Sequence, residues 1–142
     1  MNVDISFLTE TARSPSKSKV NDAGWDLYAD LPMGITVIPA NEVRKVSTGF
    51  KLSIQDGWCA YIVPRSSGAM KMLDISGIID SNYRGEVFVI IRNNGTSDIV
   101  IEHLERIAQI LFLEVPQVDW FVRDRLLPSD RGEDGFGSSG RF

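Results

Sequence analysis

Residues 63–68 hold the side chains of this sequence that are best suited to bind an anion. Arg65 offers a planar fork of N–H donors, and Ser66 and Ser67 offer hydroxyl donors. If the chain enters a helix here, the free N–H groups of its first turn point at the same anion. The pattern predicts a phosphate-binding turn, and its alternative is an ordinary strand-to-helix turn with a solvated arginine.

A second segment, residues 73–86, is predicted to form a hairpin whose turn holds a carboxylate and an aromatic ring. We expect Ile78 and Ile79 to anchor Asp80 beside the core at the entry of a strand, where its carboxylate can act as a general base. Tyr83 offers a flat face to a ligand. The alternative is a β-turn in which Asp80 or a neighbour bonds its own backbone, a frequent role for such residues.

The last fifteen residues, 128–142, break the pattern of the rest of the chain. Several glycines surround an internal ring, Phe136, and Arg131 and the hydroxyl groups of Ser138 and Ser139 lie close to it in sequence. A hinged ring that stacks on a planar ligand, together with groups that contact an anion, would make a mobile lid. The alternative is a frayed terminus, because disorder concentrates at chain ends.

The elements that must position these segments read as strands. Short runs rich in Val, Ile, Phe and Tyr alternate with Gly, Pro, Asn and Asp, which is typical of an all-β sandwich or barrel. The predicted strands are residues 2–8, 25–29, 42–49, 50–54, 59–63, 86–92, 98–101, 107–113 and 118–124. One short helix is predicted at 67–73, where hydroxyl groups can cap it.

Composition excludes several classes of protein. The 142 residues suffice for one domain with a single core. Cys59 has no partner for a disulfide, and with His103 it cannot complete a four-ligand zinc site. The net charge of −4 argues against broad binding of nucleic acid, and no apolar run suits a membrane. We therefore expect a cytoplasmic protein without a targeting segment, or a nuclear one if the source is eukaryotic or viral, whose chemistry relies on carboxylates.

Five motifs in order resemble those of the trimeric dUTPase family. They occupy residues 23–29, 64–69, 77–86, 105–109 and 131–140, which together span nearly the whole chain. The resemblance implies a jelly-roll-like β-barrel of the β-clip type that forms a homotrimer with shared active sites. It also implies a barrel domain of residues 1–127 and a flexible, glycine-rich lid of residues 128–142.

The family's activity implies a Mg²⁺-dependent hydrolase that converts dUTP to dUMP and pyrophosphate, limiting uracil in DNA and supplying dUMP for thymidylate synthesis. By this resemblance, Asp80 would orient and deprotonate the water that attacks the α-phosphorus. Tyr83 would pack against the deoxyribose and leave no room for a 2′-hydroxyl group. Such a reaction needs positioning and charge neutralisation more than covalent chemistry, so the scarcity of His and Cys is no obstacle.

The resemblance also assigns residues that bind the base. The turn at 74–80 would pair its backbone with the uracil edge and crowd the C5 position, against which a thymine methyl group would clash. This group comprises Asp74, Gly77, Ile78, Ile79 and, on the strand that follows, Phe88. Many family members carry asparagine where this chain has Asp74, so either backbone groups read the uracil or the alignment shifts by one residue.

Two further groups would hold the triphosphate. The first binds the phosphate chain and comprises Arg65, Ser66, Ser67 and Gln109, with Asp26 and Arg106 in support. The second closes over the nucleotide and comprises Arg131, Phe136, Gly137, Ser138 and Ser139. Phe136 would stack on uracil and Arg131 would reach the γ-phosphate. Mg²⁺ would ride on the triphosphate without direct protein ligands, offsetting the negative charge of both partners.

Two other functions are compatible with the same fold. A dCTP deaminase or bifunctional relative would need a catalytic glutamate on the strand after Asp80, and the matching position holds Ile90. A trimer that only binds nucleotide or a regulatory protein would have no need of Asp80 together with the tail motif. Both features favour turnover of dUTP.

Overall fold

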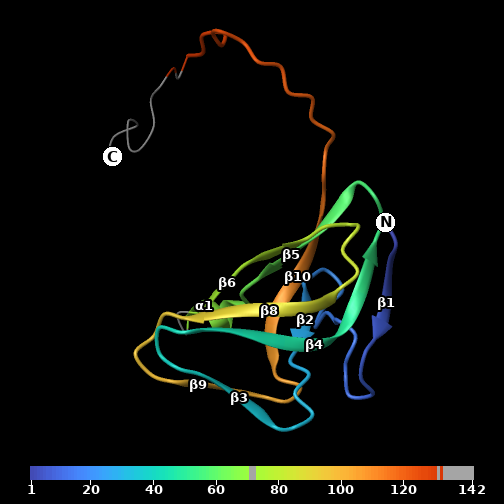
Figure 1. Ribbon diagram of the computed structural model, residues 1–142, viewed down its shortest axis with the longest axis vertical. Coiled ribbons are helices and arrows are strands. Elements are labelled where there is room, and N and C mark those ends of the chain that lie inside the picture. Colours follow the sequence, from blue (N-terminus) through green and yellow to red (C-terminus); the bar gives the residue numbers. More distant parts are fainter. Residues whose placement is uncertain (71–72, 131, 133–142) are drawn as a thin grey trace.

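The computed structural model describes residues 1–70, 73–130 and 132, and it is built almost entirely of antiparallel strands (Figure 1). One four-stranded sheet has the order β1 (Val3–Phe7), β4 (Val43–Ile54), β8 (Glu86–Asn93) and β6 (Leu73–Ile75). The other has the order β2 (Trp25–Tyr28), β10 (Arg106–Glu114), β5 (Trp58–Val63) and β7 (Gly77–Ile79). A two-stranded sheet pairs β3 (Ile35–Ile38) with β9 (Ile99–Glu102), and α1 spans Ser66–Met70.

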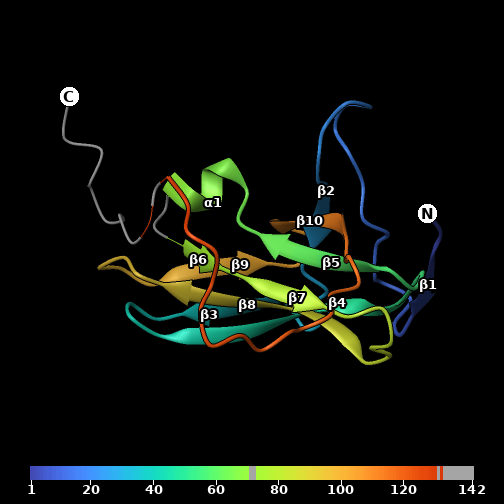
Figure 2. The same cartoon turned by 90° about the horizontal axis from the view of Figure 1, so that it is seen from above.

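The core lies between the two larger sheets, which form opposite layers in Figure 2. Along β8, Val87, Val89 and Ile91 are buried while the residues between them face outward, as the period of two in a strand requires. Leu27 and Ile110 bring buried side chains to the same core from the other sheet. The expected all-β, jelly-roll-like fold is confirmed.

Before residue 115, the observed strands and helix differ from the predicted set in three ways. The runs 42–49 and 50–54 form the single strand β4, because the irregularity near Gly49 is a bulge and not a turn. The short strands β3, β6 and β7 were not in the predicted set. The predicted helix at 67–73 is shifted to α1, and Leu73 begins β6. Within the described residues, no helix is long and apolar enough to cross a membrane.

The segment 73–86 contains a corner between the two sheets, so the predicted hairpin is wrong. Strand β6 pairs with β8, whereas β7 pairs with β5. Ile75 and Ile79 are both buried, and each packs into the core from a different sheet. The chain therefore changes sheets at Ser76, as strands do at the corners of packed sheets, and Asp80 follows the end of β7 directly.

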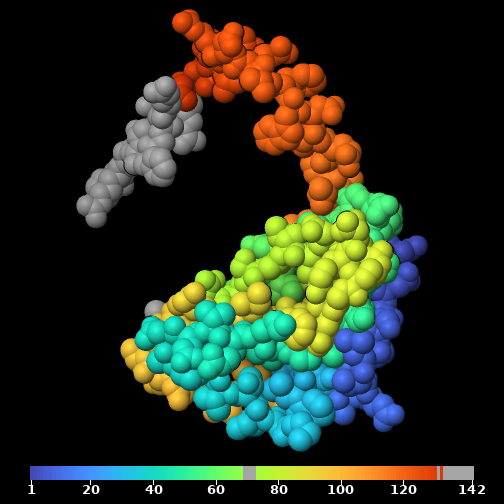
Figure 3. Space-filling view, in the orientation of Figure 1, coloured from blue at the N-terminus to red at the C-terminus, as the bar shows by residue number. Residues whose placement is uncertain are grey.

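The chain leaves the barrel after β10. Residues 115–130 contain neither helix nor strand, and they extend away from the sheets (Figures 1 and 3). The predicted strand at 118–124 is wrong for this reason, since a strand needs a neighbour for its hydrogen bonds. Trp120 is 89% exposed and Val122 is 97% exposed. We call residues 115–127 the arm.

Candidate active site

A cavity of about 320 Å³ lies beside Asp80, and we call it the Asp80 cavity. Its lining comes mainly from β7, from β8 and from the turn between them, and comprises Lys45, Ile62, Ser76, Gly77, Ile78, Ile79, Asp80, Tyr83, Glu86, Val87, Phe88 and Ile90. Six residues of the predicted site are therefore brought together here, namely Gly77, Ile78, Ile79, Asp80, Tyr83 and Phe88. Half of the others are apolar, namely Ile62, Val87 and Ile90, and together with Ile78, Ile79 and Phe88 they give the cavity a mainly apolar wall that suits a flat ligand.

Asp80 presents its carboxylate to solvent at the end of a well-anchored strand. Ile79 is 8% exposed and fixes β7 to the core, whereas Ile78 is 69% exposed and faces outward. The turn after β7 is closed by the backbone N–H of Tyr83, which donates to the backbone carbonyl of Asp80 at 3.1 Å. This bond does not use the Asp80 side chain, which leaves the carboxylate available as a base.

The Tyr83 ring is held above Gly85. The Tyr83 hydroxyl donates to the backbone carbonyl of Glu86 at 3.2 Å. A Cβ atom on Gly85 would lie only 2.2 Å from the Tyr83 hydroxyl oxygen, so the ring can occupy this position only because residue 85 is glycine. With 45% of its surface exposed, Tyr83 still presents a face to the Asp80 cavity.

A second cavity, of about 260 Å³, is lined by polar residues, and we call it the Arg65 cavity. Its lining comprises Ser18, Asp22, Ala23, Gly24, Asp26, Arg65, Ser66 and Gln109. Strand β10 runs between β2 and β5, and in this register Gln109 lies opposite both Asp26 and Val63. The strand order thus joins three motifs that are far apart in sequence.

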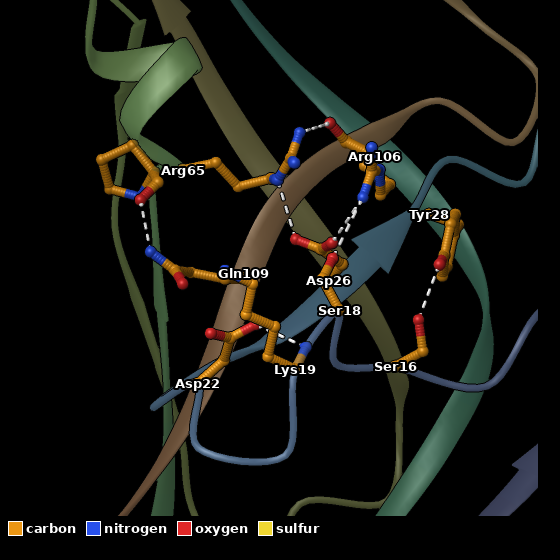
Figure 4. Close-up of polar contacts among 10 residues, drawn as sticks. Ser16, Ser18, Lys19, Asp22, Asp26, Tyr28, Arg65, Arg106 and Gln109 are labelled. Carbon is orange, nitrogen blue, oxygen red and sulfur yellow. Dashed lines mark hydrogen bonds and ion pairs between the residues drawn. The ribbon is translucent and has the colours of Figure 1, made fainter.

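The Asp26 carboxylate fixes two arginines at the Arg65 cavity (Figure 4). Arg65 Nε lies 2.7 Å from Asp26 Oδ1, and Arg106 Nη1 lies 3.2 Å from Asp26 Oδ2. Arg65 Nη1 also donates to the backbone carbonyl of Arg106 at 3.2 Å. Two guanidinium groups share one carboxylate, so the cluster keeps one positive charge and can attract an anion.

Gln109 is positioned by the backbone of both flanking segments. Its Nε2 donates to the carbonyl of Pro64 at 3.0 Å. On the other side, a Cβ atom on Gly24 would lie 2.6 Å from Gln109 Oε1, so only glycine leaves room for the amide. Ser67 lies outside the Arg65 cavity and lines a smaller pocket beside Arg65 and Arg106.

The two cavities are separated within one chain. Among the described residues, none lines both cavities. Asp80 follows Ile79, which pairs with Ala60 near the start of β5, whereas Arg65 lies just past the other end of that strand. At about 3.3 Å per residue, the five steps from Ala60 to Arg65 correspond to a separation of about 16 Å. The predicted residues therefore form two groups in a single chain.

Other predicted residues fall elsewhere. Asp74 lies on β6 opposite Arg92 and lines neither cavity, because the alternation of that short strand turns Ile75 to the core. The predicted lid residues lie outside the described residues, and they are Arg131, Phe136, Gly137, Ser138 and Ser139.

The structure adds residues that the motifs did not single out. The Lys45 ammonium lies 3.9 Å from the centre of the Phe88 ring, at the wall of the Asp80 cavity. No sequence signal indicates this contact, because it depends on the register between β4 and β8. Glu86 also lines the cavity, and its place in the third motif was a signal that could have identified it.

Comparison with known proteins agrees with this arrangement. The family model described as dUTPase matches residues 10–140. This chain belongs to the dUTPase family. The dUTPase match includes the segments that line both cavities as well as the tail motif.

Relatives of this dUTPase-family chain resemble it over nearly their full length. It is 38% identical over 144 residues to the deoxyuridine 5′-triphosphate nucleotidohydrolase of Yarrowia lipolytica, covering 99% of this chain and 90% of the relative. It is 36% identical over 148 residues to that of Burkholderia cenocepacia, covering 99% of each. Among solved structures, the G164S mutant of the Staphylococcus bacteriophage 80alpha dUTPase with dUpNHpp is 25% identical, with a TM-score of 0.89 and 98% of each chain covered.

Proposed function

We propose that this protein hydrolyses dUTP to dUMP and pyrophosphate. The observation that carries the proposal is the Asp80 cavity, in which an exposed carboxylate and the face of Tyr83 adjoin a mainly apolar wall. The names of the relatives support the same reaction. A dCTP deaminase is disfavoured, because Ile90 occupies the position of the glutamate it needs and lines the cavity with a hydrocarbon side chain.

The nucleoside is proposed to occupy the Asp80 cavity. Among the described residues, strand β7 pairs with β5 alone and forms the edge of its sheet, so the backbone groups on its other side would pair with the edge of uracil. Gly77 and Ile78 would provide these groups, which removes the need for Asp74. The Tyr83 ring would pack against the deoxyribose, where a 2′-hydroxyl group would collide with it.

The reaction is a displacement at the α-phosphorus by water. The Asp80 carboxylate would accept a proton from this water and hold it in line with the leaving pyrophosphate. Pyrophosphate departs with the electron pair of the broken P–O bond, and its negative charge must be neutralised as it develops. Arginine side chains and the Mg²⁺ that dUTP carries would meet this need.

The phosphate chain is proposed to contact the Arg65 cavity of a neighbouring copy. Asp80 and Arg65 of one chain lie at opposite ends of β5, too far apart to act on one nucleotide in that geometry. Arg65, Ser66 and Gln109 from a second copy would complete the site. In a homotrimer, the Asp80 cavity of each copy would face the Arg65 cavity of the next copy. A single threefold axis then forms three equivalent sites.

The arm supports an assembly of several copies. Its exposed apolar side chains include Trp120, Phe121, Leu126 and Leu127. An apolar stretch of this kind usually marks a contact surface. We propose that the arm lies on a neighbouring barrel, so that the unit 1–127 delivers the lid 128–142 to a site shared between copies. Arg131, Phe136, Gly137, Ser138 and Ser139 would then close over the triphosphate.

Magnesium is proposed to arrive with the substrate. In the part of the chain that the structure describes, no three His, Cys, Asp or Glu side chains group together to hold a metal ion. Mg²⁺ commonly binds through phosphate oxygens and water with one or two carboxylates at most, so these residues suit a magnesium complex of dUTP. We further propose that the protein acts in the cytoplasm, where the free thiol of Cys59 stays reduced.

A substrate panel tests the proposed reaction. Purified protein with Mg²⁺ is expected to release pyrophosphate from dUTP at least about a hundredfold faster than from UTP, dCTP or dTTP, because the 2′-hydroxyl group of UTP and the methyl group of dTTP would clash and the cytosine edge would be left unpaired. Pyrophosphate release is measured by a coupled phosphate assay. Equal rates on dCTP and dUTP, or no release from either, would overturn the proposal.

Removal of residues 128–142 tests the lid. We expect the truncated protein to keep its fold and assembly but to lose about a hundredfold or more in kcat/KM for dUTP, the size expected when transition-state donors are removed. Removal of residues 141–142 alone, which lie beyond the fifth motif, is the matched control. Sedimentation gives the assembly state. A truncated enzyme with full activity would exclude the lid role.

A further inference from the structure

Strand β4 contains a bulge opposite the start of β8. Ser47 pairs with Phe88, and the next pair along the two strands is Lys51 with Glu86. Three residues of β4 therefore face one residue of β8. Gly49, in the middle of this bulge, has a φ of 72°, which lies in the left-handed region that favours glycine. Such a bulge leaves backbone groups that need partners.

The Glu86 carboxylate supplies a partner to this bulge. Its Oε1 accepts hydrogen bonds from the Ser47 hydroxyl and from the backbone N–H of Gly49, the latter at 3.2 Å. The adjacent Thr48 hydroxyl, which is buried, donates to the carbonyl of Val87 at 2.5 Å. These bonds fasten the first residues of β8 to β4, and with them the backbone of Glu86.

The backbone of Glu86 holds the Tyr83 ring. The backbone carbonyl of Glu86 accepts the Tyr83 hydroxyl, and Gly85 leaves the space in which the ring lies. A shift of the Glu86 backbone would therefore move the ring. Glu86 also lines the Asp80 cavity, although the proposed reaction gives its carboxylate no chemical step.

We propose that Glu86 is a positioning residue that sets the Tyr83 ring and thereby the preference for deoxyribose over ribose. The inference rests on the proposed function. One oxygen atom accepts both bonds from β4, so a neutral acceptor of the same shape can replace the carboxylate. Glutamine retains this acceptor, whereas alanine leaves the Ser47 hydroxyl and the Gly49 N–H without it.

The test compares kcat/KM for dUTP with kcat/KM for UTP in matched variants. Glu86→Ala is expected to lower the dUTP-to-UTP ratio by about tenfold, the upper range for loss of one hydrogen-bond anchor, and to act mainly through faster turnover of UTP. Glu86→Gln is expected to keep the wild-type ratio within about twofold, because its amide oxygen accepts the same two bonds. Gly85→Ala, which displaces the ring directly, should lower the ratio at least as much as Glu86→Ala.

A double-mutant cycle separates positioning from a general loss of stability. Tyr83→Phe removes the hydroxyl that binds the Glu86 carbonyl, so adding Glu86→Ala to it should lower the ratio by less than the product of the two single effects. If Glu86→Ala does not fold, Ser47→Ala removes one of the two donors more gently and should lower the ratio by about threefold. Thermal denaturation of each variant reports folding.

Several results would overturn the role of Glu86. A folded Glu86→Ala variant with the wild-type ratio overturns the inference, as does a Glu86→Gln variant that loses as much as Glu86→Ala, or a cycle without coupling. A folded Ser47→Ala variant with an unchanged ratio does the same where Glu86→Ala is insoluble. Wild-type protein that turns over neither dUTP nor UTP overturns the proposed function first, and the inference with it.

Discussion

Asp80→Asn is expected to lower kcat for dUTP hydrolysis by about a thousandfold, within the range that a positioned general base contributes. Asparagine has nearly the shape of aspartate but cannot accept the proton of the attacking water. The turn itself should persist, because the bond that closes it uses the backbone carbonyl of Asp80. The dissociation constant for dUTP, measured by calorimetry, should stay within about threefold of wild type. The substitution removes one negative charge near the phosphates, and solvent screens the effect of an exposed charge.

Asp4→Asn provides the matched control. Asp4 is an exposed residue of β1, an edge strand whose residues line neither cavity. The same chemical change should there leave kcat unaltered, so a loss of activity in the Asp80 variant alone assigns the effect to the site. An Asp80→Asn protein that retains a tenth or more of the wild-type kcat would remove Asp80 from the role of base.

Arg65→Ala is expected to lower kcat/KM for dUTP by about a hundredfold or more, as for a lost donor to the charge that develops in a transition state. The more telling result concerns mixed assemblies. If each site takes Asp80 from one copy and Arg65 from the next, co-expression of Arg65→Ala with Asp80→Asn rebuilds intact sites. In random assembly at equal amounts, about a quarter of the sites receive both native residues from adjacent copies.

The control for mixing is the Asp80→Asn protein co-expressed with an Asp80→Asn, Arg65→Ala double variant. No copy in that mixture supplies Asp80, so activity should stay at the level of the single variant. Differently tagged subunits allow the mixed assemblies to be isolated before pyrophosphate release is measured. If the mixture of Arg65→Ala with Asp80→Asn also stays inactive while mixed assemblies form, then Asp80 and Arg65 act within one chain and the shared site is refuted.

Several features of the fold followed from sequence because they depend on local patterns. The apolar runs at 86–92 and 107–113 identify β8 and β10, since β-branched and aromatic residues favour strands and turn residues precede or follow these runs. The sequence divided β4 into two strands at Gly49, because glycine often interrupts a strand, and only the pairing with β8 shows that the strand continues through a bulge. The arm shows the opposite error. Residues 118–124 contain the β-branched and aromatic side chains that strands favour, but they pair with no other segment in the part of the chain that the structure describes.

The candidate site was predictable in its residue types and less so in its geometry. Asp80, Tyr83 and Phe88 lie together because they follow one another around a single turn and strand. By contrast, Asp26, Arg65 and Gln109 meet only because β10 runs between β2 and β5, an order that no local pattern indicates. The corner at Ser76 likewise depends on two sheets packing together, and it decides that Asp74 faces away from the Asp80 cavity.

The Asp26 carboxylate has a consequence for the entropy of binding. Arginine is among the side chains with the most rotamers to lose, and fixing such a side chain costs about 0.5–1.5 kcal/mol when it happens on association. Asp26 and the Arg106 carbonyl already hold the Arg65 guanidinium in the folded chain. The Arg65 side chain therefore loses its conformational entropy when the protein folds. An anion that binds in the Arg65 cavity does not have to order this side chain again.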